Sequence, residues 1–92
     1  MTLPEQLGNI GSEVSRADSA QGKNAERFNN AVARALELFD CTLADARWRG
    51  RRLEIGRARE VFCDAVTGGR EYGSELADFQ KYFDQFAYAS QH

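Results

Sequence analysis

The chain has 92 residues, of which 42% are hydrophobic and 28% charged, so it has the length and composition of one small globular domain. These values argue against an intrinsically disordered chain, and no apolar run reaches the ~18 residues of a membrane span. The formal net charge of −2 disfavours non-specific attraction to nucleic acid. Because the first residues lack the basic and apolar segments of a signal peptide, we expect a cytoplasmic protein.

A first helix is predicted over residues 3–20. Thr2 and Glu5 have the spacing of a capping box, in which each side chain binds the backbone N–H of the other residue. Apolar residues then recur every three or four positions, at Leu3, Leu7, Ile10, Val14 and Ala17. Gly8 and Gly11 each cost about 0.8–1 kcal/mol relative to alanine inside a helix. This helix is therefore the least stable of those predicted.

A second helix is predicted over residues 24–43, with the strongest signals in the chain. Gly22 is a helix-stop signal, and Asn24 is a preferred N-cap residue. The apolar face that follows is wide and consists of Phe28, Val32, Ala35, Leu36, Phe39 and Leu43. We expect this face to be buried.

Two further helices are predicted, over residues 46–67 and 75–89. Asp45 is the expected N-cap of the third helix, and the Gly68-Gly69 pair is expected to end that helix. Ser74 is the expected N-cap of the fourth helix. The inward positions of the third helix are Trp48, Ile55, Ala58, Phe62, Ala65 and Val66. Those of the fourth helix are Leu76, Phe79, Phe83, Phe86 and Ala87.

The short connections make consecutive helices antiparallel neighbours, which predicts an all-α fold, a small antiparallel up-and-down helical bundle. It forms one domain over residues 1–92, built either of four helices or of three helices with residues 1–20 as a mobile segment. Several apolar residues lie off the predicted inward faces, namely Leu38, Leu53, Tyr82, Tyr88 and Ala89. These leftover positions suggest a second contact surface, such as that of a homodimer.

The strongest local feature is the thirteen-residue stretch from Arg47 to Arg59, which holds six of the twelve basic side chains and one acid, Glu54. Its formal charge is +5, whereas the remaining residues hold six bases and thirteen acids and sum to −7. On a helix these arginines spread around the circumference, and Arg57, Glu60 and Asp64 form an outward strip with successive spacings of three and four residues. Further partners on the second and fourth helices are Glu37, Asp40, Asp78 and Asp84. We therefore expect most of the cluster to pair with the protein's own carboxylates.

The beginning of this stretch is the part that local acids do not obviously match. Arg47, Arg49, Arg51 and Arg52 crowd together there, with Trp48 between two of them. These five residues are our candidate binding site for an anion or a partner. We expect Trp48 to anchor one end of the core, with stacking on a base or a cation–π contact with Arg52 as the alternatives.

Catalytic chemistry finds little support in the sequence. The only histidine, His92, is the last residue, where order is least expected, and no phosphate-loop motif occurs. Cys41 and Cys63 are too few and too far apart for a disulfide scaffold or a zinc site, and we expect two buried reduced thiols. The sequence thus predicts no catalytic residue, no metal site and no cofactor.

One acidic pattern suggests a chemical alternative. The pairs Glu37-x-x-Asp40 and Glu60-x-x-x-Asp64 resemble the acidic motifs that hold magnesium in all-α nucleoside triphosphate pyrophosphohydrolases. The second spacing is one residue longer than in that family, and Glu37 and Glu60 lie opposite the apolar residues of their helices. Such a hydrolase would require the four carboxylates to converge in the fold.

Three hypotheses for function follow. The sequence favours a non-enzymatic helical protein that acts through protein–protein association, as an adaptor, a regulator or a subunit, by binding a partner protein or a second copy of itself. The second hypothesis is binding of nucleic acid or an anionic ligand through the Arg47–Arg59 segment. The third is a metal-dependent nucleotide hydrolase of all-α type. No interaction with a membrane is expected.

Overall fold

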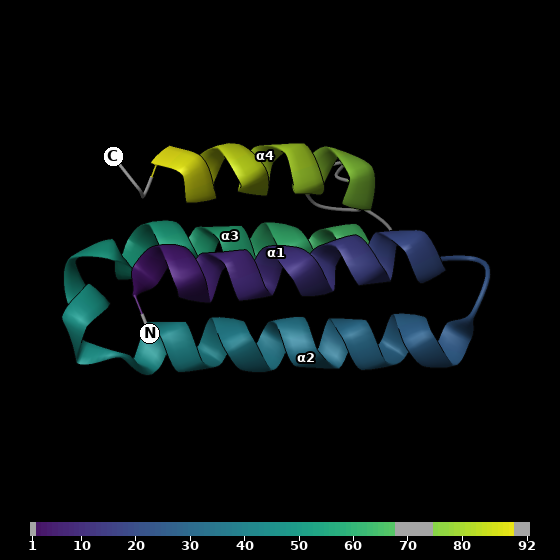
Figure 1. The fold of residues 1–92 in the computed structure, drawn as a ribbon, viewed down its shortest axis with the longest axis horizontal. Coiled ribbons are helices and arrows are strands. Elements are labelled where there is room, and N and C mark those ends of the chain that lie inside the picture. Colours follow the sequence, from purple (N-terminus) through teal and green to yellow (C-terminus); the bar gives the residue numbers. More distant parts are fainter. Residues whose placement is uncertain (1, 68–74, 90–92) are drawn as a thin grey trace.

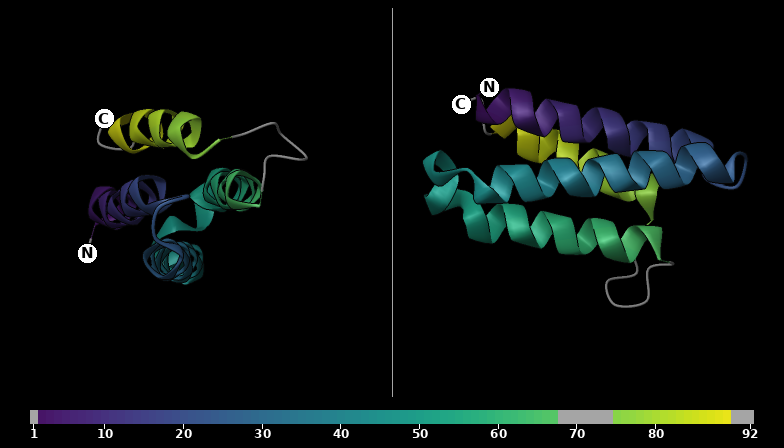
Figure 2. Two further views of the ribbon diagram at one scale, coloured as in Figure 1. Left: turned by 90° about the vertical axis from the view of Figure 1, so that its right-hand side faces the viewer. Right: turned by 90° about the horizontal axis from the view of Figure 1, so that it is seen from below.

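The computed structural model describes residues 2–67 and 75–89, which form four α-helices, one 3₁₀-helix and no strand (Figure 1). The elements are α1 (Leu3–Ala20), α2 (Ala25–Ala44), η1 (Ala46–Arg51), α3 (Arg52–Val66) and α4 (Leu76–Ala89). Consecutive α-helices run in opposite directions, and each packs against two others, so that they form a ring in the order α1, α2, α3, α4 (Figure 2). The predicted all-α antiparallel bundle is confirmed. No helix in this part of the chain has both the length and the apolarity to cross a membrane.

Helix α1 is well packed despite its two internal glycines. Thr2 Oγ1 accepts a hydrogen bond from the Glu5 N–H at 3.3 Å, and the Thr2 N–H donates to Glu5 Oε1 at 3.1 Å, so the predicted capping box is confirmed. The buried residues of α1 are Leu3, Leu7, Ile10, Glu13, Val14, Ala17 and Ala20. Each buried Leu, Ile or Val contributes about 1.5–3 kcal/mol, which together outweighs the roughly 2 kcal/mol cost of Gly8 and Gly11. Packing, mainly on α2, therefore compensates for the weak propensity of this helix.

The buried line of α2 differs from the predicted face. Its fully buried residues are Ala31, Ala35, Phe39 and Thr42, whereas Phe28, Val32, Leu36 and Leu43 are only half-buried. Leu38, which we expected to point away, also packs partly against the core. The reason is the extensive contact between α1 and α2. The small side chains of Ala31 and Ala35 let the two helices approach closely, and the larger apolar side chains of α2 lie at the edges of this contact.

Phenylalanines from three helices fill the centre of the bundle. The ring of Phe39 on α2 lies 5.9 Å from that of Phe62 on α3 and 5.8 Å from that of Phe83 on α4, between ring centroids. Phe79 stacks on Phe83 at 5.6 Å and contacts Phe62 at 5.5 Å. All four rings are buried, which confirms these predicted inward positions. Aromatic pairs at such distances contribute about 0.5–1.5 kcal/mol each beyond the area that they bury.

The predicted third helix, 46–67, is divided in two, and this part of the prediction is wrong. Asp45 caps η1 instead of a long α-helix, by accepting a hydrogen bond from the Arg47 N–H. Trp48 has non-helical backbone angles, φ −106° and ψ 22°, and α3 begins only at Arg52. The inward positions Ile55, Ala58, Phe62 and Ala65 are buried as predicted, while Trp48 and Val66 are half-buried. The predicted signals at Gly68, Gly69 and Ser74 lie outside the described residues.

The two cysteines do not match the predicted pair of buried thiols. Cys41 is exposed on α2, and Cys63 on α3 is half-buried, with Arg59 Nη1 at 3.8 Å from its sulfur. Both are free. The buried line of α2 passes through Phe39 and Thr42, which leaves Cys41 between them on the outer surface.

Candidate binding site at the arginine-rich end of the bundle

Residues 46–53, which comprise η1 and the first turn of α3, form what we call the arginine-rich end. It lies where α1 begins and where α2 and α4 end, opposite the turn between α1 and α2 (Figures 1 and 2). The Arg51 guanidinium lies 5.8 Å from the ring centroid of Phe86, which ties this end to the last turns of α4. The five predicted site residues, Arg47, Trp48, Arg49, Arg51 and Arg52, therefore gather at one end of the molecule.

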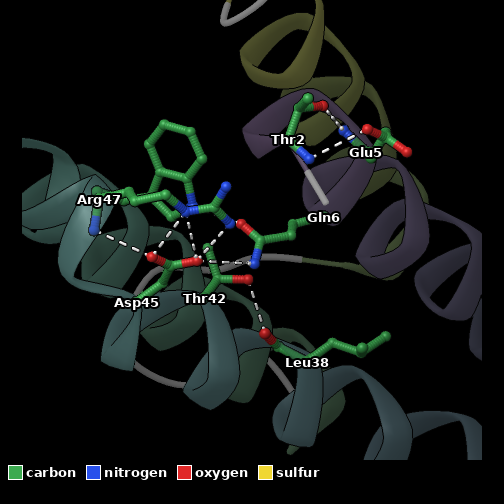
Figure 3. A network of polar contacts seen from close by, with 8 residues as sticks. Thr2, Glu5, Gln6, Leu38, Thr42, Asp45 and Arg47 are labelled. Atoms are coloured by element: carbon green, nitrogen blue, oxygen red, sulfur yellow. Dashed lines mark hydrogen bonds and ion pairs between the residues drawn. The ribbon is translucent and has the colours of Figure 1, made fainter.

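Asp45 organises the start of this segment (Figure 3). Its Oδ1 accepts hydrogen bonds from the backbone N–H of Arg47 at 3.0 Å and from Arg47 Nε at 3.1 Å, and its Oδ2 accepts from Arg47 Nη2 at 2.7 Å. These bonds, first those of the Arg47 side chain and then that of its backbone, hold the pKa of Asp45 far below its ordinary value. The same contact raises the pKa of Arg47. Asp45 thus neutralises one arginine of the cluster and fixes its direction.

Gln6, a residue of α1, binds this segment through both the oxygen and the nitrogen of its side-chain amide. Its Oε1 accepts a hydrogen bond from the Trp48 indole N–H at 2.6 Å, and its Nε2 donates to Asp45 Oδ2 at 3.4 Å (Figure 3). Trp48 also packs against the core, as expected of an anchor. The cation–π partner of its ring is Arg47, at 4.9 Å, and not Arg52 as we suggested.

Internal partners hold most of the other arginines. Arg51 pairs with Glu54 at 2.8 Å, and Arg52 Nε donates to the carbonyl oxygen of Leu43 at the end of α2 at 3.0 Å. The predicted pairing between helices is confirmed for Arg59, which lies 2.9 Å from Asp40. The predicted outward strip is wrong at Asp64, because that residue is buried. Arg49 and Arg57 make no ion pair with any residue that the structure describes.

Exposed apolar side chains accompany these arginines. Leu53, the second residue of α3, is 83% exposed, and Tyr88, near the end of α4, is 66% exposed. Both belong to the same end of the bundle as η1 (Figure 1). Tyr82, which is 42% exposed, lies nearer the beginning of α4 and stacks on Phe86. Two residues of the predicted apolar surplus, Leu53 and Tyr88, are therefore exposed at the end of the bundle where the arginines lie.

The four carboxylates of the hydrolase hypothesis do not form a cluster. Glu37 pairs with Arg34 of its own helix at 3.7 Å, and Asp40 pairs with Arg59. Glu60 is exposed, whereas Asp64 is buried. Within residues 2–67 and 75–89, no group of three or more His, Cys, Asp or Glu side chains is placed to hold a metal ion. The convergence that this hypothesis requires is thus not found among these four residues.

A second basic cluster lies at the opposite end, and the sequence patterns did not reveal it. Arg16 on α1, Lys23 in the turn, and Arg27 and Arg34 on α2 line one groove. They are spread over nineteen positions of the sequence, so no local count of charge identifies them. The signal that could have found them is the chain reversal at Gly22, because it places these four residues on two adjacent helices and the turn between them.

Comparisons with known proteins add no further information. No family model, no curated protein and no solved structure matches this chain.

Proposed function

We propose that this protein acts through protein–protein association and that the arginine-rich end is its contact surface. The observation that carries the proposal is the exposure of Leu53, at 83%, among arginines whose directions are fixed by internal contacts. Its role would be that of an adaptor, a regulator or a subunit. A partner protein or a second copy of the chain would cover this end.

The composition of the surface supports this proposal. Trp, Tyr and Arg are the residue types enriched in interface hot spots, and Trp48, Tyr88 and Arg49 lie at this end. Transfer of Leu53 from water into an interface would contribute about 1.5–3 kcal/mol. Arg47 and Arg51 are already oriented by Asp45 and Glu54, so binding would cost less side-chain entropy than with free arginines.

Self-association is tested by sedimentation velocity over a wide range of protein concentration. We expect the wild-type chain to form a dimer as concentration rises, and the variant Leu53→Glu to stay monomeric. Ala33→Glu is the matched control, because Ala33 is exposed on α2, away from the arginine-rich end, and the substitution adds the same charge. Both variants should retain the thermal stability of the wild-type chain, since neither residue is buried.

A heterologous partner is tested by placing a photoreactive phenylalanine derivative at position 53 or, as control, at position 33 in cells that make the protein. A discrete cross-linked species that forms from position 53 and not from position 33 supports the proposal. A chain that is monomeric at every concentration and gives no cross-link specific to position 53 would refute it.

Binding of nucleic acid through the Arg47–Arg59 segment has weaker support. Within this segment, Arg49 and Arg57 are the two arginines whose side chains have neither an ion pair nor a hydrogen bond with the described residues, and they belong to different elements. Retention on duplex and single-stranded DNA at low salt, compared between the wild-type chain and Arg49→Glu, tests this alternative. Retention that is lost in the variant and weakened by added salt would favour it.

A further inference from the structure

A groove runs along α1 and α2 at the end of the bundle opposite the arginine-rich end. Its volume is about 810 Å³, which lies within the range of small-ligand sites. Four cationic side chains line it, Arg16, Lys23, Arg27 and Arg34, together with one carboxylate, Glu13. We call this feature the basic groove.

The turn between α1 and α2 builds the groove. Gly22 has φ +76°, a left-handed conformation that glycine adopts without strain, and the N–H groups of Lys23 and Asn24 both donate to the carbonyl oxygen of Ala20. Asn24 then caps α2 by accepting from the Arg27 N–H at 3.0 Å. The chain reverses within a few residues, so the last turns of α1 face the first turns of α2 (Figure 2).

Charge in the basic groove is strongly positive. Four cations and one carboxylate give +3, in a chain whose net charge is −2. Glu13 is buried and pairs with Arg16 at 2.6 Å. Arg34 forms a longer ion pair, at 3.7 Å, with the exposed Glu37. Lys23 and Arg27 form no ion pair with the residues that the structure describes. A ligand can therefore bind these two cations without breaking an ion pair with a residue of the described part of the chain, and the N-terminus of α2 adds partial positive charge beside them.

The polar side chains of the groove are those that bind phosphate oxygens. Hydroxyl groups come from Ser15 and Ser19, and amide groups from Asn24 and Asn30. Arg27 and Arg34 are seven residues apart on one helix, which corresponds to roughly 10 Å along its axis. A chain of phosphates can therefore contact more of the four cations that line the groove at once than a single phosphate group can.

We propose that the basic groove binds a small oligophosphate, such as inorganic tripolyphosphate or the phosphate chain of a nucleoside triphosphate. Arg16 and Lys23 would contact it from the α1 side and the turn, and Arg27 and Arg34 from α2. A long nucleic acid fits less well, because the chain outside the groove has a formal charge of −5 and repels a polyanion that extends beyond it. This site is independent of the association proposed for the arginine-rich end.

Isothermal titration calorimetry of the full chain with inorganic tripolyphosphate tests the proposal. We expect saturable binding that weakens at least about tenfold in the double variant Lys23→Glu/Arg27→Glu, because hydrogen bonds to charged groups of two side chains are lost. The matched control is Arg57→Glu/Lys81→Glu, which reverses one arginine and one lysine that are exposed outside the groove. Circular dichroism and thermal unfolding verify that both variants are folded.

Further ligands distinguish the source of the phosphates. Equal affinity for adenosine triphosphate and tripolyphosphate would assign recognition to the phosphate chain alone, and tighter binding of adenosine triphosphate would assign the site to a nucleotide. Orthophosphate should bind much more weakly than either. The proposal is overturned if tripolyphosphate gives no saturable binding, if the control variant weakens it equally, if orthophosphate binds as tightly, or if a single-stranded oligonucleotide binds more tightly than both triphosphates.

Discussion

Replacement of Gly8 by alanine should stabilise the protein, although the glycine lies in a helix that is already packed. Gly8 is exposed in the interior of α1, and a Cβ atom added there would meet no atom within 4 Å. Alanine is better than glycine by about 0.8–1.0 kcal/mol in a helix interior, because glycine loses more backbone entropy on folding. The expected gain in the free energy of unfolding for Gly8→Ala is therefore about 1 kcal/mol, with no change in the core.

This gain is measurable by urea denaturation and by thermal unfolding. For a domain of this size, 1 kcal/mol corresponds to a rise in Tm of about 4–8 °C. The slope of the free energy against urea should be unchanged, because the surface exposed on unfolding stays the same.

Gly22→Ala is the control of opposite sign. A Cβ atom added at Gly22 would also meet open space, but the φ of +76° disfavours any residue with a Cβ atom, at a cost of roughly 1–2 kcal/mol. We therefore expect Gly8→Ala to stabilise and Gly22→Ala to destabilise the same chain. A neutral or negative effect of Gly8→Ala would refute the reasoning, since it would mean that α1 is not a helix at that position or that it contributes nothing to folding.

Two further predictions concern the core and the arginine-rich end. Phe39→Ala should lower the free energy of unfolding by about 3–5 kcal/mol, because Phe39 is fully buried between Phe62 and Phe83. Tyr88→Ala, at an exposed residue, should change the free energy of unfolding by less than about 0.5 kcal/mol. If urea denaturation shows the two variants to be equally destabilised, the assigned core is wrong. Asp45 has a lowered pKa, so its contribution to stability is complete above the unfolded-state value of 3.8 and is lost as the pH falls below it. The wild-type chain should therefore be more stable than Asp45→Asn at neutral pH, and this difference in stability should shrink below about pH 4. Thermal unfolding monitored by Trp48 fluorescence measures the stability of both chains at each pH. A difference in stability that does not change with pH would mean that the charge of Asp45 has no role.

Local patterns in the sequence were sufficient to predict the helices and several of their ends. The capping box at Thr2 and Glu5 and the N-cap at Asn24 lie within four residues of the groups that they bind, so their spacing alone indicates the contact. The helical repeat of apolar residues likewise predicts α1 and α4, because periodicity along a helix is a local property. Both signals remain valid without knowledge of the neighbouring helices.

Contacts between distant residues decided the site. The interruption at Trp48 is accompanied by a hydrogen bond to Gln6, which is 42 positions away, and local helix signals contain no information about that contact. Arg59 pairs with Asp40 on another helix, whereas Arg47 pairs with Asp45, just before the stretch, and Arg51 pairs with Glu54, within it. The sequence suggested internal pairing in general, but the choice of partner depends on distances across the bundle.

Helix propensity, capping, short connections and charge are local properties, so they were enough to predict an all-α bundle, its antiparallel order and an excess of arginine in one short segment. The folded chain was needed to show which arginines are neutralised, which leucine stays exposed beside them, and that Arg16, Lys23, Arg27 and Arg34 share a groove. The physical reason is that electrostatic and apolar contacts depend on distance in space, and the close packing of α1 on α2 brings together residues that are far apart along the chain.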